Sequence, residues 1–167
     1  MSADAAPIPT SSTFRDAMVC LGAAVSVVTT HGPAGRLGVT ATTVCSVWGS
    51  PASLLLCING NARIHNALQQ NGVFAVNLLA AGQEDLSGLF SSADTPMEQR
   101  FAGAGGLLMT GLGFPGLAAA QLTLACTVSR TMDASTHNIV LGEVREILEG
   151  KGQGGGAGAI SRNDPRL

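Results

Sequence analysis

Small hydroxyl and thiol side chains gather in one stretch of the chain, between Gly38 and Asn59. They follow one another closely at Thr40, Thr42, Thr43, Cys45 and Ser46. In a β-strand, such small side chains leave the backbone open to a molecule that lies flat on it. The same pattern suits an ordinary half-buried strand, because β-branched threonine favours strands. The residues alone leave both interpretations open.

The acid–base groups that enzymes use are sparse and scattered. Three histidines occur, in a predicted turn, in a predicted helix and at the start of a predicted strand: His31, His65 and His137. The carboxylates form no close pair, and no serine lies in the Gly-x-Ser-x-Gly motif of a nucleophile elbow. An enzyme with so few acid–base groups needs a cofactor to supply its chemistry.

The segment Asn61-Ala62-Arg63 begins a predicted helix and could hold a phosphate. The free backbone N–H groups of a helix N-terminus, the helix dipole and an arginine all attract an anion. The ordinary alternatives are that Asn61 is only an N-cap and that Arg63 is a solvated surface residue. Both alternatives stay open on the residues alone.

The composition excludes several classes of protein. The net charge is −2 with no basic run, so we expect no nucleic-acid partner. No apolar stretch reaches the ~18 residues that span a bilayer, and no secretory signal is evident, so we expect a cytoplasmic protein without a membrane partner. Hydrophobic residues make up 46% and charged residues 12%, which favours an additional subunit interface.

The four cysteines, at positions 20, 45, 57 and 126, show no spacing typical of a metal site. No Cys-x-x-Cys pair occurs and no nearby histidine completes a ligand set. The ordinary interpretation is that they are small reduced core residues. Cys45 stands out because it lies in the hydroxyl-rich stretch.

The predicted elements indicate a mainly β domain. The predicted strands are Val25–Thr30, Leu37–Val47, Leu54–Ile58, Phe74–Leu79, Leu122–Ser129 and His137–Leu148. Most neighbours in sequence are joined by short turns, which favours antiparallel pairing in a small closed barrel with helical insertions. No strand–Gly-x-Gly-x-x-Gly–helix unit supports a Rossmann domain. A loop is expected over residues 102–116, and another over 130–136.

Four short helices are predicted, starting at Thr13, Asn61, Glu84 and Thr95. Thr13 and Asp16 are spaced as a capping box, and Asn61 is spaced as an N-cap with Gly72 as the stop. Phe14, Ala17, Met18 and Leu21 recur at helical spacing, which predicts a core or interface face. The predicted organisation is a flexible tail over residues 1–12, a domain over 13–149 and a Gly-rich segment over 150–167, of which residues 150–158 should be mobile.

Several segments, in this order, carry a resemblance to a known family: FRDAM (14–18), AAVSVVTT (23–30), GVTATTVCSV (38–47), CIN (57–59), FAVNLL (74–79), MEQRF (97–101) and THNIVLGEV (136–144). The chain resembles the short-chain flavin reductases. It is most similar to the reductase components of two-component aromatic hydroxylases, such as 4-hydroxyphenylacetate 3-monooxygenase. The likeness covers the chain from Phe14 to about Leu148.

The resemblance implies a homodimeric split β-barrel that reduces FMN or FAD with NADH or NADPH. It implies that the reduced flavin diffuses to a partner oxygenase acting on an aromatic substrate. It places His137 against the nicotinamide, as the residue closest to catalysis. The flavin-contacting residues that it implies are Thr40, Ala41, Thr42, Thr43, Val44, Cys45, Ser46, Asn61, Ala62, Arg63, Leu89, Phe90, Ser91 and Ser92.

Two departures from the family pattern bear on the nicotinamide side. The chain ends GAISRNDPRL and has no tyrosine, where the family has an aromatic strand. Ser135 stands where the family has the glycine of its Gly-x-His motif. Two further hypotheses therefore accompany the reductase: a flavin-binding or carrier protein with little reductase activity, and a non-catalytic barrel dimer that serves as an interaction module.

Overall fold

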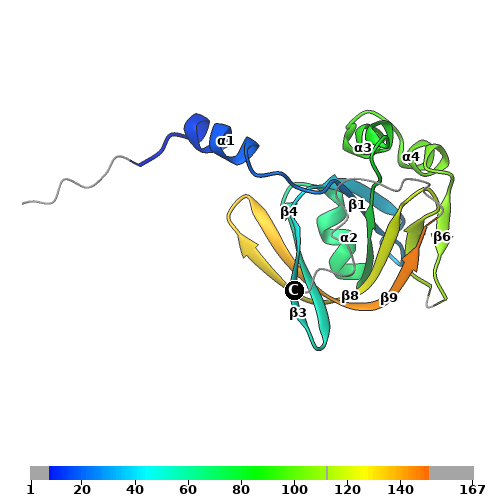
Figure 1. Cartoon of the computed structure of the whole chain (residues 1–167). Coiled ribbons are helices and arrows are strands. Elements are labelled where there is room, and N and C mark those ends of the chain that lie inside the picture. Colours follow the sequence, from blue (N-terminus) through cyan, green and yellow to red (C-terminus); the bar gives the residue numbers. More distant parts are fainter. Residues whose placement is uncertain (1–7, 112, 151–167) are drawn as a thin grey trace, which may run out of the picture.

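The computed structural model describes residues 8–111 and 113–150, and the largest unit of these residues is one curled antiparallel sheet (Figure 1). The predicted mainly β class is confirmed. The strands are β1 (Ser26–Thr30), β2 (Leu37–Ala41), β3 (Val44–Gly49), β4 (Ala52–Asn59), β5 (Val73–Leu78), β6 (Leu107–Met109), β7 (Pro115–Leu117), β8 (Leu122–Ala134) and β9 (His137–Glu149). The helices are α1 (Ser11–Val19), α2 (Arg63–Asn71), α3 (Glu84–Ser91) and α4 (Met97–Gly103). The predicted Gly-rich segment lies outside the described residues, apart from Gly150.

The main sheet has the strand order β2-β1-β5-β8-β9-β4-β3, so β2 and β3 lie at its opposite edges. Yet only Thr42 and Thr43 separate these two strands in the sequence. The sheet must therefore curl until its edges approach each other. The prediction of one strand over Leu37–Val47 is wrong, because the chain leaves one edge at Ala41 and joins the other at Val44. Since β2 and β3 do not pair, the barrel is split along a seam rather than closed.

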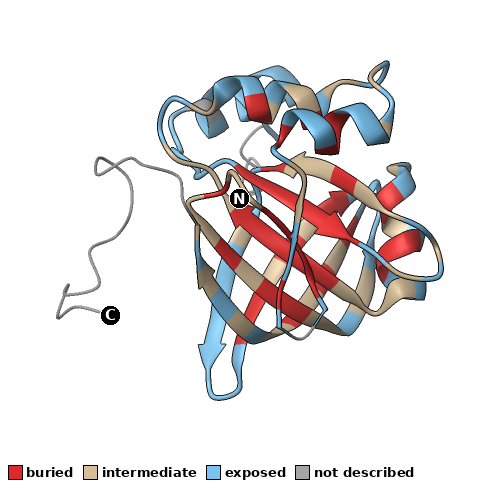
Figure 2. Ribbon diagram, turned by 90° about the vertical axis from the view of Figure 1, so that its right-hand side faces the viewer, coloured by how far each residue is buried: buried red, intermediate tan, exposed pale blue. Residues whose placement is uncertain are grey.

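Apolar side chains pack on both faces of the sheet, and Figure 2 shows the buried residues running along its strands. Inside the barrel, Val28 packs in a cluster with Leu56 and Phe74. The neighbouring Val27 packs on the other face, in a second cluster with residues of α3 and α4 such as Phe90. Because alternate residues of a strand point to opposite faces, β1 is buried on both sides. The strand thereby holds the helices against the barrel.

A buried amide joins the strands beneath the second cluster. The Asn77 side chain is fully buried and donates to the Val27 carbonyl at 2.8 Å and to the Thr29 hydroxyl at 3.0 Å. Its Oδ1 accepts from the Leu117 N–H at 2.8 Å and from the Thr123 hydroxyl at 2.9 Å. The hydrogen-bonding capacity of Asn77 is thus largely satisfied, which is what burial of a polar group requires. This amide connects β1, β5, β7 and β8.

Helix α1 begins earlier than predicted and packs on little of the protein. Thr10, not Thr13, is the N-cap, because its side chain accepts from the Thr13 N–H at 3.3 Å. The helix stands away from the barrel (Figure 1). Its predicted apolar face remains uncovered, with Phe14 60% and Leu21 66% exposed. That face is therefore no part of the core of this chain.

Two predicted loops contain regular structure. The Gly-rich segment 102–116 forms the ribbon of β6 and β7, in which Leu107 pairs with Leu117. The expected loop over 130–136 is instead the end of a long hairpin, because β8 continues to Ala134 and β9 starts at His137. The β6–β7 ribbon was not predicted because its short apolar runs lie beside glycines. The end of the β8–β9 hairpin was not predicted because its residues are polar and exposed.

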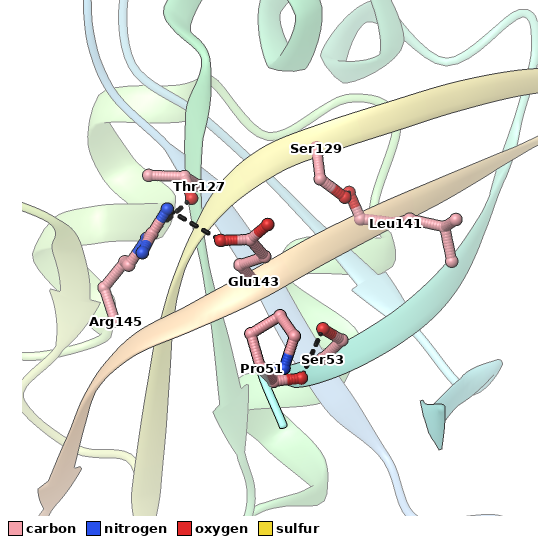
Figure 3. Close-up of polar contacts among 7 residues, drawn as sticks. All are labelled: Pro51, Ser53, Thr127, Ser129, Leu141, Glu143 and Arg145. Atoms are coloured by element: carbon pink, nitrogen blue, oxygen red, sulfur yellow. Dashed lines mark hydrogen bonds and ion pairs between the residues drawn. The ribbon is translucent and has the colours of Figure 1, made fainter. Parts of the chain in front are cut away.

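The outer face of the β4–β9–β8 region carries a polar row (Figure 3). Glu143 lies opposite Ser53 on one side and Thr127 on the other. Arg145 pairs with the Glu143 carboxylate at 2.7 Å and donates to the Thr127 hydroxyl at 3.0 Å. The adjoining row includes Leu55 and Leu141, which pair in register and are only half-buried.

Candidate functional site

A pocket of about 220 Å³ opens at the seam of the barrel. It joins residues from β2, the link 42–43, β4, the start of α2 and β9. Its lining consists of Val39, Thr40, Ala41, Thr42, Thr43, Cys57, Ile58, Asn59, Ala62 and His137. The hydroxyl-rich segment and the predicted catalytic histidine, which are far apart in sequence, therefore meet in one pocket.

Sheet register brings these residues together. The Cys57 N–H donates to the Thr43 carbonyl at 3.0 Å, which fixes the link against the end of β4. Asn59 at the end of β4 pairs with His137 at the start of β9. The pocket thus lies where three strands end or begin. Such strand ends leave side chains and backbone groups free to contact a ligand.

Predicted site residues fall into three groups. Thr40 to Thr43, Ala62 and His137 line the pocket. Val44, Cys45 and Ser46 continue along β3, where Cys45 and Ser46 are exposed, and Asn61 and Arg63 are exposed beside the pocket at the start of α2. The segment 89–92 does not line it: Phe90 is buried in the second cluster, and Leu89 borders a separate hollow between α3 and α4. Ser91 is exposed and Ser92 half-buried.

Sequence reasoning missed Val39, Cys57, Ile58 and Asn59 as lining residues. Cys57 to Asn59 form the end of β4, which the sequence presents only as an apolar strand. They reach the pocket because the link 42–43 crosses the end of β4. Only the strand order reveals this crossing, and no local pattern in the sequence encodes it.

His137 follows a tight turn and is held by its neighbour. The Thr136 hydroxyl and His137 Nδ1 are 2.9 Å apart, so a hydrogen bond orients the ring and leaves Nε2 available to a ligand. Ser135 adopts a φ of 59°, in the left-handed region that favours glycine. Serine at the family's glycine position therefore strains the backbone of this turn, but the turn still forms.

The side chain of Asn138, the residue after His137, has one buried hydrogen-bond acceptor that is unused among the described residues. Asn138 is 6% exposed, and its Oδ1 is buried without a hydrogen-bond partner among the described residues. It lies under Gly60, where a side chain would come within 3.1 Å of Asn138 Nδ2. Buried polar groups normally have partners, so this amide can receive a water molecule or a polar group of a ligand.

The start of α2 can hold an anion. Ala62 is the N-cap and makes no side-chain capping bond, so the prediction of Asn61 as the cap is wrong. Asn61 instead donates its backbone N–H to Asn59 Oδ1 at 2.9 Å. The first N–H groups of α2 therefore lack a side-chain partner, and Arg63 stands beside them. Gly72, with a φ of 68°, ends the helix as predicted.

The electrostatics of the pocket suit a polar, uncharged ring linked to a phosphate. Within the described part of the chain no carboxylate lines the pocket, and the start of α2 provides positive potential. Cys126 is remote from this chemistry: burial raises the pKa of its thiol from 9.0 to about 12, and the side chain packs in the barrel core. Among the described residues, no group of histidine, cysteine and carboxylate side chains could hold a metal ion. The described part of the chain also has no helix long and apolar enough to cross a membrane.

Comparison with known families gives one match that covers most of the chain. The family described as the flavin reductase-like domain matches residues 18–160. A relative from Cronobacter sakazakii named FMN reductase (NADH) RutF is 51% identical over 135 residues, which cover 80% of each chain. A relative of the same name from Enterobacter cloacae is 46% identical over 141 residues, covering 84% of each chain.

Solved structures show the same fold. A candidate flavin reductase from Haemophilus somnus superposes with a TM-score of 0.80 and 38% identity, over 86% of this chain and 90% of its own. BorF, the flavin reductase component of a bacterial two-component tryptophan halogenase, superposes with a TM-score of 0.76 and 26% identity, over 84% of this chain and 88% of its own. The split sheet and its position in the chain are thus shared with these proteins.

Proposed function

Because this chain belongs to the flavin reductase-like domain family, we propose that it is an NADH-dependent FMN reductase. The observation that carries the proposal is the seam pocket, which combines the hydroxyl-rich segment with His137 and contains no carboxylate. When both substrates are bound, the nicotinamide supplies hydride to the flavin, so the protein needs no general base of its own. This requirement agrees with the sparse acid–base groups of the chain.

The role proposed for the pocket residues is to bind and orient. β2 and β3 are edge strands, so backbone groups on one side of each face the seam. N–H groups of the segment 42–46 would stabilise the negative charge of reduced flavin, an effect of roughly 3 kcal/mol per well-placed donor. Arg63 and the start of α2 would hold the phosphate. His137, oriented by Thr136, would contact the nicotinamide.

We further propose that the reduced flavin leaves the protein and reaches a separate oxygenase. The pocket supports this because it is open at the seam and lies at the surface. BorF, a structural neighbour, is by its description the reductase component of a two-component system. That the oxygenase acts on an aromatic substrate is supported by the sequence resemblance alone.

A homodimer is also part of the proposal. The apolar face of α1 is uncovered, as the exposed fractions of Phe14 and Leu21 show. On β3, Trp48 is 53% exposed, and the row of Leu55 and Leu141 is only half-buried. Uncovered apolar surface of this extent in a charge-poor chain is typical of a subunit interface. Sedimentation of the purified protein tests this part.

The decisive experiment for the reductase is anaerobic NADH oxidation with added FMN, followed at the NADH absorbance band. We expect turnover with FMN and NADH. Parallel assays with FAD in place of FMN, and with NADPH in place of NADH, define which flavin and which nicotinamide the protein prefers. Tight FMN binding without turnover would instead identify a flavin carrier. If the protein binds neither FMN nor FAD, the proposal is contradicted, and the hypothesis of a non-catalytic interaction module is the one that remains.

A further inference from the structure

The two short helices α3 and α4 hold β2 from outside the barrel, at every second residue. The Arg36 guanidinium, just before β2, pairs with the Glu98 carboxylate of α4 and lies 4.8 Å from the centre of the Phe101 ring. A side chain at Gly38 would meet the Phe90 ring at 2.6 Å, so glycine is what lets α3 approach. These contacts place the helix pair directly against the strand.

Thr40 provides the next contact along the strand. Its hydroxyl donates to the Ser87 carbonyl of α3 at 2.6 Å. Thr40 and its two neighbours in β2, Val39 and Ala41, all line the seam pocket. Since β2 is an edge strand that pairs with no described strand except β1, the helix pair supplies a large part of the support behind this wall of the pocket.

Arg100 of α4 is the buried charge that holds α3 in place. It is only 9% exposed. Its Nε donates to the Thr95 carbonyl at 2.8 Å, one terminal nitrogen donates to the Phe90 carbonyl at 3.3 Å, and the other donates to the Ser92 carbonyl. No carboxylate pairs with Arg100 among the described residues. A buried guanidinium with three carbonyl acceptors acts here as a cap on the C-terminal end of α3.

Phe90 transmits this contact to the pocket. Its carbonyl accepts from Arg100, while its ring lies against Gly38 of β2 and meets the Phe101 ring edge-on, with centroids 5.4 Å apart. Loss of the guanidinium would leave the carbonyls of Phe90, Ser92 and Thr95 without this donor, so the end of α3 would have to move. A shift of Phe90 would then release β2 at Gly38, next to the lining residue Val39.

We propose that Arg100 is a positioning residue for the flavin pocket, acting through Phe90 and β2 rather than by contact with the ligand. This inference rests on the proposed function for the identity of the ligand, FMN. It predicts that Arg100 variants weaken FMN binding more than they slow turnover at saturation. A displaced wall would lose contacts with the bound flavin, so the effect is expected in FMN affinity rather than in turnover at saturation.

The test compares Arg100→Met and Arg100→Lys with the control Arg145→Met, which removes an exposed arginine from β9. FMN affinity is measured by quenching of flavin fluorescence, and kcat and both KM values by NADH oxidation, below the unfolding temperature of each variant. We expect Arg100→Met to raise the Kd and KM for FMN about tenfold with kcat changed less than twofold. Arg100→Lys should recover part of the affinity, and Arg145→Met should match the wild type.

Other outcomes would overturn the inference. The first is an unchanged FMN affinity in a folded Arg100→Met protein. The second is a loss of kcat that only follows the fraction of unfolded protein. If Arg100→Met does not fold, Phe90→Leu decides: it keeps the carbonyl and removes the ring contact with Gly38, and it must weaken FMN binding. A wild-type protein that binds FMN without oxidising NADH would contradict the proposed function while leaving the Arg100 inference open to the same binding test.

Discussion

Replacing Asn77 by alanine should strongly destabilise the protein, because its amide is fully buried and makes four short hydrogen bonds, each 3.0 Å or less. The Thr29 and Thr123 hydroxyls can rotate toward other partners. The Leu117 N–H cannot, and a buried donor without an acceptor costs ~1–3 kcal/mol. The freed Val27 carbonyl and the vacated volume add to this, so we expect a loss of about 4 kcal/mol.

Urea unfolding followed by circular dichroism measures this loss, as a lower midpoint at an unchanged m-value. Asn66→Ala is the matched control: Asn66 is exposed on α2, and its replacement should change stability by less than ~0.5 kcal/mol. If Asn77→Ala lowers the free energy of unfolding by less than ~1 kcal/mol, with the same m-value as the wild type, the view that this amide holds β1, β5, β7 and β8 together is refuted.

Three further predictions concern single residues. Ser135→Gly should raise the free energy of unfolding by about 1 kcal/mol, because serine occupies the left-handed region there; an unchanged or lower melting temperature would contradict this. Cys126 keeps its proton in the folded protein up to a pKa of about 12 against 9.0 for a free thiol. Stability should therefore fall as pH rises above about 9, by up to ~1.4 kcal/mol per pH unit, and Cys126→Val should abolish that slope in urea titrations. His137→Ala should raise the KM for NADH at least several-fold more than that for FMN, with exposed His31→Ala as the control; equal effects on both substrates would remove His137 from its assigned role.

Local sequence signals were sufficient for most elements. The β-branched run of β1, the apolar run of β4 and the Gly72 stop of α2 all appear where their patterns predict them. Three of the four helix starts were misplaced: α4 has Pro96, not Thr95, as its N-cap, and the other two differ for a shared reason. Thr13 and Asn61 are both good capping residues, but the extended backbone that a cap requires lies at Thr10 and at Ala62. Capping propensity does not decide between neighbouring positions.

The pocket was only partly predictable. The hydroxyl-rich segment could be recognised from its composition, and His137 from the family resemblance. The contribution of Cys57 and Asn59 depends on which strands end beside one another, which is a property of the strand order. The burial of Phe90 likewise depends on tertiary packing against Gly38. The kind of ligand that the pocket could bind was thus predictable from residue types. The contacts between segments distant in sequence were not predictable.

The link of Thr42 and Thr43 limits how far the barrel can open. Ala41 ends one edge of the sheet and Val44 begins the other, and a chain of three Cα steps can reach no more than about 11 Å. At this end of the molecule, the two edges therefore cannot move apart beyond that length without loss of strand structure. The length of a single short connection, rather than any side chain, therefore limits the width of the seam there. Lengthening or shortening this link would be the most direct way to change which flat molecules the fold accepts.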